Sequence, residues 1–335
     1  MKSLLDLLRL GPIKTIIVKI IVPVADLALA PVTFLSALLL KLIRRVGVYR
    51  MRVSKKVFEA VGVFPIRDHY YEPMFNPRHL RRSLREDREL PGIDLNVRGQ
   101  LELLDRLRFG EEQNLFPREK RGEFEYYYNN PNFGPGDAEY LYGLIRLYKP
   151  ATVLEIGSGL CTLMARNAVA ANRSEDPGYR CNHVCIEPYE MRWLNALDNV
   201  EVIRSTMEEV DRKLFARLGR NDILFIDSSH VIRPQGDVVV EYLEILPILQ
   251  PGVLVHIHDI FTPKDYPDEW VIEQVRLWNE QYIVEAFLSF NEHFKIIAAL
   301  NYLRHHFAES LAEKCPVLAE NMDGLEPRSL WLVRV

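Results

Sequence analysis

Short apolar runs alternate with helical patterns of apolar residues from about residue 151 to the end of the chain. An apolar run bounded by turn residues predicts a buried strand, whereas apolar residues three to four positions apart predict an amphipathic helix. The pattern predicts strands at 151–156, 182–187, 200–204, 222–227, 252–258, 294–299 and 329–334, with helices between most of them, including 236–249 and 268–288. Strands that alternate with helices form a mostly parallel sheet with helices on both faces. We therefore predict an α/β fold of the doubly wound, Rossmann-like class.

The chain before this alternating region is less regular. Apolar residues at helical spacing predict helices over Asp94–Leu107 and Ala138–Tyr148, and Asp137 stands where an N-cap residue would begin the second helix. Aromatic residues concentrate in two loops, 64–73 and 123–137. The first loop either covers a substrate pocket or packs its tyrosines on the domain, and the sequence leaves both alternatives open. The second directly precedes the ligand-binding strand and its helix, so it either closes over the ligand or serves to cap that helix through Asp137.

The first part of the chain combines apolar and basic residues. Between Lys19 and Lys41 the only charged residue is Asp26, and this stretch approaches the ~20 residues that cross a bilayer. Asp26 and two prolines disfavour a span, and the basic cluster after Lys41 would keep a catalytic domain cytoplasmic. Three alternatives stay open: helices on the membrane surface, a single span, and a helical hairpin packed on the enzyme or on a partner. The expected localisation is cytoplasmic, with residues 12–43 as the candidate membrane attachment.

Composition narrows the classes of function. The chain has 335 residues, of which 48% are hydrophobic and 26% charged, as in a soluble domain with an extension. We divide it into a helical extension (1–56), a lead-in that covers the active site (57–122) and a catalytic domain (123–335). The net charge of −4 gives no reason to expect nucleic acid as a partner. The four cysteines lack zinc-like spacing, so we expect reduced thiols, and nothing in the sequence predicts the oligomeric state.

A glycine turn follows the first predicted strand. The sequence Glu155-Ile-Gly157-Ser158-Gly159 passes from strand to helix, and its glycines allow a tight turn against a ligand. The free N–H groups at the start of the next helix would face that ligand. A dinucleotide fingerprint needs glycine or alanine where Thr162 stands, so that match is incomplete. The turn resembles the first motif of class I S-adenosylmethionine (SAM)-dependent methyltransferases; the alternative is an ordinary turn of an α/β protein.

The next two strand ends would complete a nucleoside site. Glu187 ends the second strand, where a carboxylate accepts hydrogen bonds from the two hydroxyls of a ribose. Ser205 and Met207 follow the third strand and would flank the adenine ring. The alternative for Glu187 is a surface carboxylate that happens to end a strand.

The fourth and fifth strands end in ionisable residues. Asp227 and His230 follow the fourth strand, and Asp259 ends the fifth. Because parallel strands present their carboxyl ends at one edge, these side chains should converge there. A histidine can remove a proton from a hydroxyl near neutral pH, and two carboxylates suit Mg²⁺. The alternatives are backbone hydrogen bonding for Asp259 and core packing for His256 and His258, which share one face of their strand.

Four runs of residues resemble the motifs of a known family. They are Ile226-Asp-Ser-Ser-His230, Leu246-Pro to Pro251-Gly252, His256-Ile-His-Asp-Ile260 and Ser329-Leu-Trp-Leu-Val-Arg334. With the glycine turn, they make residues 123–335 resemble a class I SAM-dependent methyltransferase of family 24, whose relatives include macrolide and sugar O-methyltransferases. The resemblance implies a seven-stranded sheet with an antiparallel last strand, SAM at the glycine turn, and strand-end aspartates that bind Mg²⁺ beside a histidine base. The SAM contacts would be Glu155, Gly157, Ser158, Gly159, Glu187, Ser205, Met207 and Asp227; the catalytic residues His230 and Asp227; the metal ligands Asp227 and Asp259.

The predicted reaction is transfer of the SAM methyl group to a hydroxyl of a sugar, glycan or natural-product acceptor, with His230 as the base. One alternative is a nicotinamide oxidoreductase, which Thr162 and the late position of Glu187 disfavour. Another is a non-catalytic module that binds a partner through the N-terminal helices, which the intact glycine turn disfavours. A hydroxylase-like relative with a different cofactor also stays open.

Overall fold

The computed structural model describes residues 17–189 and 191–335. The chain divides into two units, residues 1–79 and 80–335, which are described separately. The three-part division expected from the sequence stays a prediction. Residues 12–16 of the candidate membrane segment lie outside the described residues.

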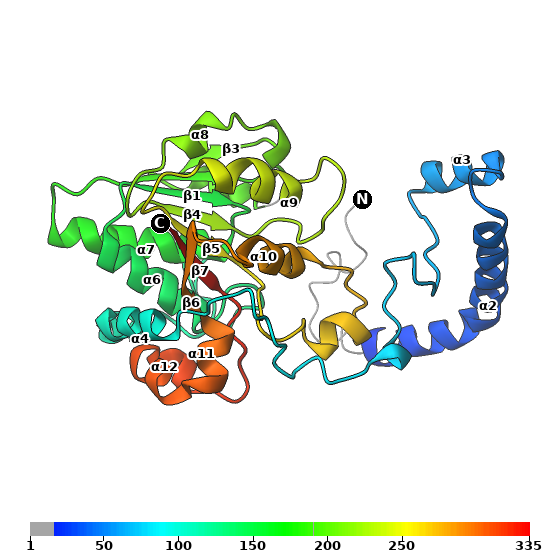
Figure 1. The fold of residues 1–335 in the computed structure, drawn as a ribbon. Helices are drawn as coiled ribbons and strands as arrows, with labels where there is room; N and C mark the ends of the chain where they lie inside the picture. Colours follow the sequence, from blue (N-terminus) through cyan, green and yellow to red (C-terminus); the bar gives the residue numbers. More distant parts are fainter. Residues whose placement is uncertain (1–16, 190) are drawn as a thin grey trace. The chain divides into compact units, whose positions relative to one another are not determined.

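One long helix dominates the described part of the N-terminal unit. The elements are η1 Ile17–Ile21, α2 Val22–Val46, α3 Arg52–Val61 and η2 Pro77–His79, where η marks a 3₁₀- or π-helical segment. Helix α2 bends along its length in Figure 1 and contains Pro31, which removes one backbone hydrogen bond from the helix interior. The continuous helix from Ile17 to Val46 is long and apolar enough to cross a membrane by length and composition alone.

The second unit contains a single seven-stranded sheet in the order β3-β2-β1-β4-β5-β7-β6 (Figure 1). The strands are β1 Thr152–Ile156, β2 Asn182–Ile186, β3 Glu201–Ile203, β4 Ile223–Ile226, β5 Leu254–Ile257, β6 Phe294–Ala299 and β7 Leu330–Arg334. Strands β1 to β5 pair in parallel, whereas β7 runs antiparallel to both β5 and β6. This confirms the predicted fold class, including the antiparallel last strand.

Helices cover both faces of the sheet, as the two-sided burial of its strands requires. Their bounds are α4 Val97–Arg106, α5 Gly110–Asn114, α6 Asp137–Tyr148, α7 Leu160–Glu175, η3 Arg192–Ala196, η4 Met207–Glu209, α8 Lys213–Ala216, α9 Asp237–Val240, η5 Glu241–Ile245, η6 Leu246–Ile248, η7 Glu269–Glu273, α10 Glu280–Leu288, α11 Leu300–His306, α12 Ala308–Lys314 and α13 Pro316–Ala319. Ile223 and Phe225 of β4 pack in one core with α6 and α7. Leu224 and Ile226 pack in the other with α9 and α10. The four cysteines are free and buried, as expected for core thiols.

The helix predicted over residues 268–288 is wrong in its middle. The chain forms η7, leaves helical geometry at residues 274–279, and starts again as α10. Val275 adopts a left-handed conformation (φ +52°), which a β-branched residue in a helix cannot do. The Asn279 side chain accepts a hydrogen bond from the N–H of Ile232 (2.6 Å), so tertiary contacts hold this segment outside a helix. The helix predicted over 236–249 exists as the consecutive segments α9, η5 and η6.

The predicted N-cap role of Asp137 is also wrong. Helix α6 begins at Asp137 itself, and Gly136 is the N-cap residue. The carboxylate of Asp137 instead accepts hydrogen bonds from the N–H groups of Arg328 and Ser329, both at 2.8 Å. Glu139 accepts the Gly136 N–H (3.0 Å) and so satisfies the helix start. Asp137 is thus released to fix the chain that enters β7.

Candidate active site

A cavity of about 500 Å³ opens at the carboxyl ends of β1, β2 and β4. This is the edge of a parallel sheet where ligands bind in folds of this class. Six of the predicted SAM contacts line the cavity: Gly157, Ser158, Gly159, Glu187, Met207 and Asp227. The volume lies in the range of ligand sites of ~300–1,000 Å³.

The glycine turn forms the floor of the cavity. Gly157 has a φ of +74°, and a Cβ there would lie 1.9 Å from the carbonyl oxygen of Asp227, so only glycine fits. A Cβ on Gly159 would meet only the methyl of Met191 at 3.8 Å, which leaves this stretch of backbone open to a ligand. The Ser158 hydroxyl is buried and has no hydrogen-bond partner in the described part of the chain. An orphaned donor beside an open backbone fits a polar ligand such as SAM.

Glu187 lies across the turn from the end of β2. Its carboxylate accepts hydrogen bonds from the N–H groups of Ser158 (3.5 Å) and Tyr189 (3.1 Å). These contacts hold the carboxylate at the cavity wall, and each of its oxygens can accept more than one hydrogen bond. The position suits recognition of two adjacent hydroxyls.

Two predicted SAM contacts lie outside the cavity lining. Glu155 is buried beneath the turn, where it accepts a hydrogen bond from the Thr162 hydroxyl (2.5 Å) and pairs with His183 Nε2 (2.6 Å). Thr162 therefore ties α7 to β1 at the position where a dinucleotide fold has glycine or alanine. Ser205 points to the carbonyl of Thr206 (3.3 Å), and Thr206 itself lines the cavity.

The ionisable residues after β4 and β5 do converge. His230 Nε2 lies 3.2 Å from Asp227 Oδ1 and 3.5 Å from Asp259 Oδ2. On the other side of the ring, Nδ1 lies 2.7 Å from Oε2 of Glu280, which is fully buried. The Tyr242 hydroxyl donates to the second oxygen of Glu280 (2.9 Å). Glu280 was missed in the sequence, because no spacing rule links it to a histidine fifty positions earlier.

Backbone strain marks the same two strand ends. His230 and Asp259 have φ values of +59° and +58°, a left-handed conformation that non-glycine residues adopt rarely. The His230 carbonyl accepts the N–H groups of Asn279 (3.0 Å) and Glu280 (3.2 Å), which fixes the strained loop to the start of α10. Such strain collects at functional sites, where the surrounding structure enforces it.

The surrounding charges make His230 a strong proton acceptor. Burial by itself lowers the pKa of His230, but Asp227, Glu280 and Asp259 outweigh it and raise that pKa well above the ordinary value. Burial likewise raises the pKa of Asp227, but His258 and His230 outweigh it and hold that pKa below its usual range. Asp227 is therefore charged, and the carboxyl groups around the ring favour the imidazolium form of His230.

His256 in β5 and His258 directly after it are both buried in the core. His256 stacks on Phe225 with ring centroids 3.9 Å apart and pairs with the Ser329 hydroxyl (2.8 Å). Burial lowers the pKa of His256 well below its ordinary value, so this ring is neutral. His258 lies on the same face, with Nε2 3.3 Å from the carbonyl of Asn132.

A divalent cation fits the acidic cluster. Asp227, His230 and Asp259 each offer one ligand atom, and these atoms lie within 4.8 Å of one another. Oδ1 of Asp259 is buried and accepts no hydrogen bond in the described part of the chain, although Nη1 of Arg328 lies 3.2 Å from it as an ion pair. Carboxylate oxygens are the ligands that Mg²⁺ prefers.

The aromatic loop 123–137 contributes to both the core and the cavity. Tyr126 and Tyr128 are fully buried, and the Tyr126 hydroxyl donates to the Phe133 carbonyl (2.7 Å). Asn132 and Phe133 line the cavity. The loop therefore packs its tyrosines in the core and presents Asn132 and Phe133 to the cavity, whereas closure over a ligand stays a prediction.

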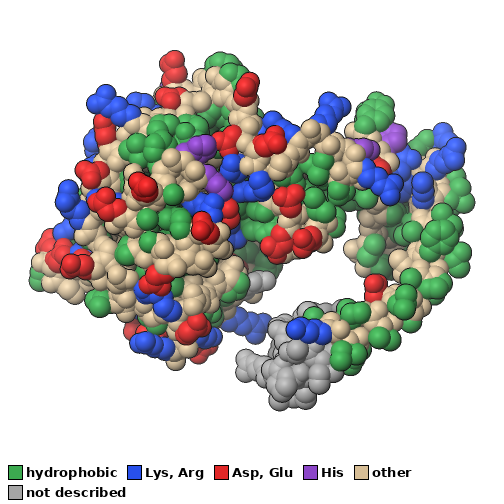
Figure 2. Space-filling view, turned by 90° about the horizontal axis from the view of Figure 1, so that it is seen from below, with side chains coloured by type: hydrophobic (Ala, Val, Ile, Leu, Met, Phe, Trp, Pro, Cys, Tyr) green, Lys and Arg blue, Asp and Glu red, His purple; other side chains and the backbone are tan. Residues whose placement is uncertain are grey.

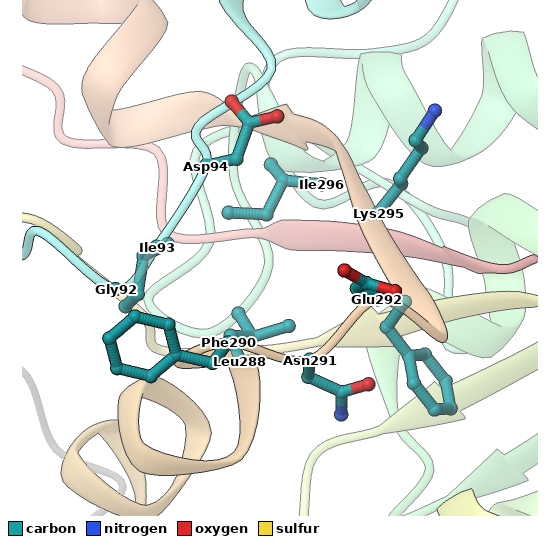
Figure 3. A pocket seen from close by; sticks show the side chains of 10 residues that line it. Gly92, Ile93, Asp94, Leu288, Phe290, Asn291, Glu292, Lys295 and Ile296 are labelled. Atoms are coloured by element: carbon teal, nitrogen blue, oxygen red, sulfur yellow. The ribbon is translucent and has the colours of Figure 1, made fainter.

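A separate cavity of about 260 Å³ lies at the start of β6 (Figure 3). Residues 92–94, the end of α10, the loop 290–292 and the first residues of β6 line it. Because β6 runs parallel to β5, its first residues lie at the sheet edge opposite the acidic cluster. This cavity is thus remote from the strand ends that bind ligands in such folds.

Known proteins resemble this chain over the same region. Residues 154–260 match the model of family 24, described as a methyltransferase domain. An uncharacterised protein of Archaeoglobus fulgidus is 31% identical over 185 residues, which cover 51% of this chain and 80% of that protein.

Two solved structures are more distant. An O-methyltransferase of Bacillus cereus in complex with S-adenosylhomocysteine (SAH) is 15% identical, with a TM-score of 0.32, covering 59% of this chain and 82% of that one. MycE methyltransferase of the mycinamycin pathway, with Mg and SAH, is 20% identical, with a TM-score of 0.26, covering 36% of this chain and only 31% of that one.

The family match spans β1 to the end of β5, and so contains the glycine turn, Glu187 and the acidic cluster. The sheet order and the antiparallel β7 agree with it. The chain belongs to the class I SAM-dependent methyltransferases and carries their family-24 methyltransferase domain.

Proposed function

We propose that the protein transfers the methyl group of SAM to a hydroxyl of a sugar, glycan or natural-product acceptor. The observation that carries this proposal is the His230 cluster, which stands next to the cavity wall at Asp227 and has Glu280 behind the ring. The choice of acceptor class follows the resemblance of the motifs to those of sugar and macrolide O-methyltransferases.

The residues of the chain would act as follows. Gly157 to Gly159 and Glu187 bind and orient SAM, which supplies a methyl group on a sulfonium. His230 accepts the acceptor's hydroxyl proton at Nε2 from its neutral form, which a cation held by Asp227 and Asp259 would favour by offsetting the charges that raise the pKa of the ring. Glu280 fixes the ring through Nδ1 and stabilises the imidazolium that results.

Asp227 and Asp259 would hold Mg²⁺, whose charge would lower the pKa of an acceptor hydroxyl. Asp227 lies at the junction of the cofactor cavity and the acidic cluster, so it would serve both. Removal of divalent ions should therefore lower turnover.

The test is methyl transfer to a panel of sugars, oligosaccharides and macrolide glycosides, followed as SAH release and as product mass, with Mg²⁺ or EDTA. We expect SAM-dependent methylation of a hydroxylated acceptor that EDTA weakens. A melting temperature that rises with NADH but not with SAH would replace this proposal with an oxidoreductase. Binding of neither cofactor would favour a non-catalytic module.

We further infer that the N-terminal unit attaches the protein to a membrane. Helix α2 exposes apolar side chains along its length, and Figure 2 shows them as a largely uncharged surface on that unit. Successive residues turn by about 100°, so exposed Leu27, Leu29, Val32 and Leu35 lie on different sides of the helix. A helix that is apolar all round fits a lipid environment.

The neighbouring residues suit the membrane interface. Helix α3 carries Arg52, Lys55 and Lys56 beside exposed Val53 and Val57, an amphipathic pattern that binds anionic lipid surfaces. The basic residues would contact headgroups while the valines enter the apolar boundary.

The double variant Leu29→Glu/Leu35→Glu should abolish flotation of the full-length protein with phosphatidylglycerol-containing vesicles, because two charges would enter the apolar layer at a cost of several kcal/mol. Leu115→Glu, at a leucine that is 82% exposed on the second unit, is the matched control and should float. Wild-type protein that stays below the vesicles would contradict membrane attachment. Resistance of the bound protein to alkaline carbonate would identify insertion rather than surface binding.

A further inference from the structure

Two tryptophans extend the active site beyond His230. The ring of Trp278 lies 4.3 Å from the His230 ring, and Trp270 meets Trp278 edge to face at 5.1 Å. Trp270 belongs to η7, and Trp278 belongs to the segment 274–279 that leaves helical geometry before α10. That segment is fixed to the loop of His230 by Asn279 and Glu280. The irregular backbone thus presents an aromatic wall beside the proposed base.

Arg276 lies within this wall. Its guanidinium carbon is 4.3 Å from the ring centroid of Trp270 and 4.4 Å from that of Trp278. Nε donates to the Gln274 side chain (2.6 Å), which fixes the plane of the group. Within residues 17–189 and 191–335, the two terminal nitrogens have neither a hydrogen-bond acceptor nor a carboxylate partner. The side chain is therefore oriented but not neutralised.

Arg328 contacts both Trp270 and Asp259. Its guanidinium lies over Trp270 at 5.4 Å, and Nη1 is 3.2 Å from Oδ1 of Asp259. Nη2 donates to the carbonyl of Asn132, a residue of the cofactor cavity. Contacts thus run from His230 through Trp278, Arg276, Trp270 and Arg328 to Asp259, and so back to His230. The wall is part of the reaction site.

The chemistry of the wall selects a class of ligand. Trp270 is buried, but the half-buried ring of Trp278 can pack against the apolar face of a sugar ring, and an arginine plane offers two parallel N–H donors to a phosphate or carboxylate. Arg276 is only partly buried, and its terminal nitrogens are available to such an anion.

We propose that Arg276, held against the rings of Trp270 and Trp278, the second of which contacts His230, binds an anionic group on a sugar acceptor. The acceptor is a sugar phosphate or a sugar carboxylate rather than a neutral sugar. This inference rests on the proposed methyltransferase function and names the substrate class of the same site.

The test is calorimetric titration of full-length protein, first with SAH and then with glucose 1-phosphate, glucuronate or methyl glucoside. We expect the two anionic sugars to bind more tightly than methyl glucoside by about tenfold or more, the worth of a charged hydrogen bond. Arg276→Gln should remove that difference, whereas Arg276→Lys should keep part of it. The phosphate and carboxylate arms identify which anion the site takes.

Arg217→Gln is the control, because it removes one positive charge from an exposed position on α8's end and should change nothing. Equal binding of charged and neutral sugars, no sugar binding, or an unaltered preference in Arg276→Gln would overturn the inference. If inorganic phosphate binds as tightly as glucose 1-phosphate, the site recognises the anion alone, and the claim that it also recognises a sugar is excluded. Failure of SAH to bind in the first step would instead count against the methyltransferase function, so the two failures are separable.

Discussion

Glu187→Ala should weaken SAH binding by about tenfold to a hundredfold, because a carboxylate that accepts two ribose hydroxyls contributes about 1.5–3 kcal/mol. The side chain stands at the end of β2, and the Ser158 and Tyr189 N–H groups hold its carboxylate at the cavity wall. Calorimetric titration of SAH into wild type and variant, with and without Mg²⁺, measures the loss.

Glu201→Ala is the matched control for this variant. Glu201 begins β3, at the opposite edge of the sheet from the cavity, and its side chain is exposed. Its removal should leave SAH affinity unchanged within about twofold, since exposed charges far from a ligand are screened. Equal affinity of Glu187→Ala and wild type would remove Glu187 from the cofactor site while leaving the glycine turn as its main support.

The fold was largely predictable because its signals are local. Each strand is a short apolar run with turn residues at both ends, and the seven predicted strands lie within two residues of those observed. The convergence of Asp227, His230 and Asp259 was predictable for the same reason, since parallel strand order places successive carboxyl ends at one edge.

The features that sequence reasoning missed depend on distant contacts. Glu280 reaches His230 only because the chain leaves helical geometry before α10, and apolar spacing over 268–288 gave no sign of that break. Aspartate is a preferred N-cap residue, but the chain that leads into β7 lies close to Asp137. Its carboxylate therefore accepts a hydrogen bond from the N–H of Ser329 instead. In both cases a tertiary hydrogen bond overrides a local preference.

His230→Gln should lower kcat by about 10²–10⁴-fold with any acceptor that supports turnover, the usual contribution of a general base. Glutamine keeps a hydrogen-bonding group near Glu280, so it avoids leaving a buried carboxylate without a partner. His230 does not line the cofactor cavity, and SAH affinity should therefore stay within about twofold of wild type. Single-turnover kinetics with bound SAM separate the chemical step from product release.

Two further variants test whether the loss of activity comes from the basic function of His230. His293→Gln, at an exposed histidine before β6, controls for loss of an imidazole and should keep full activity. Glu280→Gln keeps the hydrogen bond to Nδ1 but removes the charge that stabilises the imidazolium, so it should lower kcat by less than His230→Gln, with an unchanged KM. Wild-type kcat in His230→Gln would assign the proton to another acceptor, and Asp227 is the candidate because it both lines the cavity and lies 3.2 Å from the ring. In that case Asp227→Asn should lower kcat instead. The role of His230 would then be to hold Asp227 and Asp259 in place.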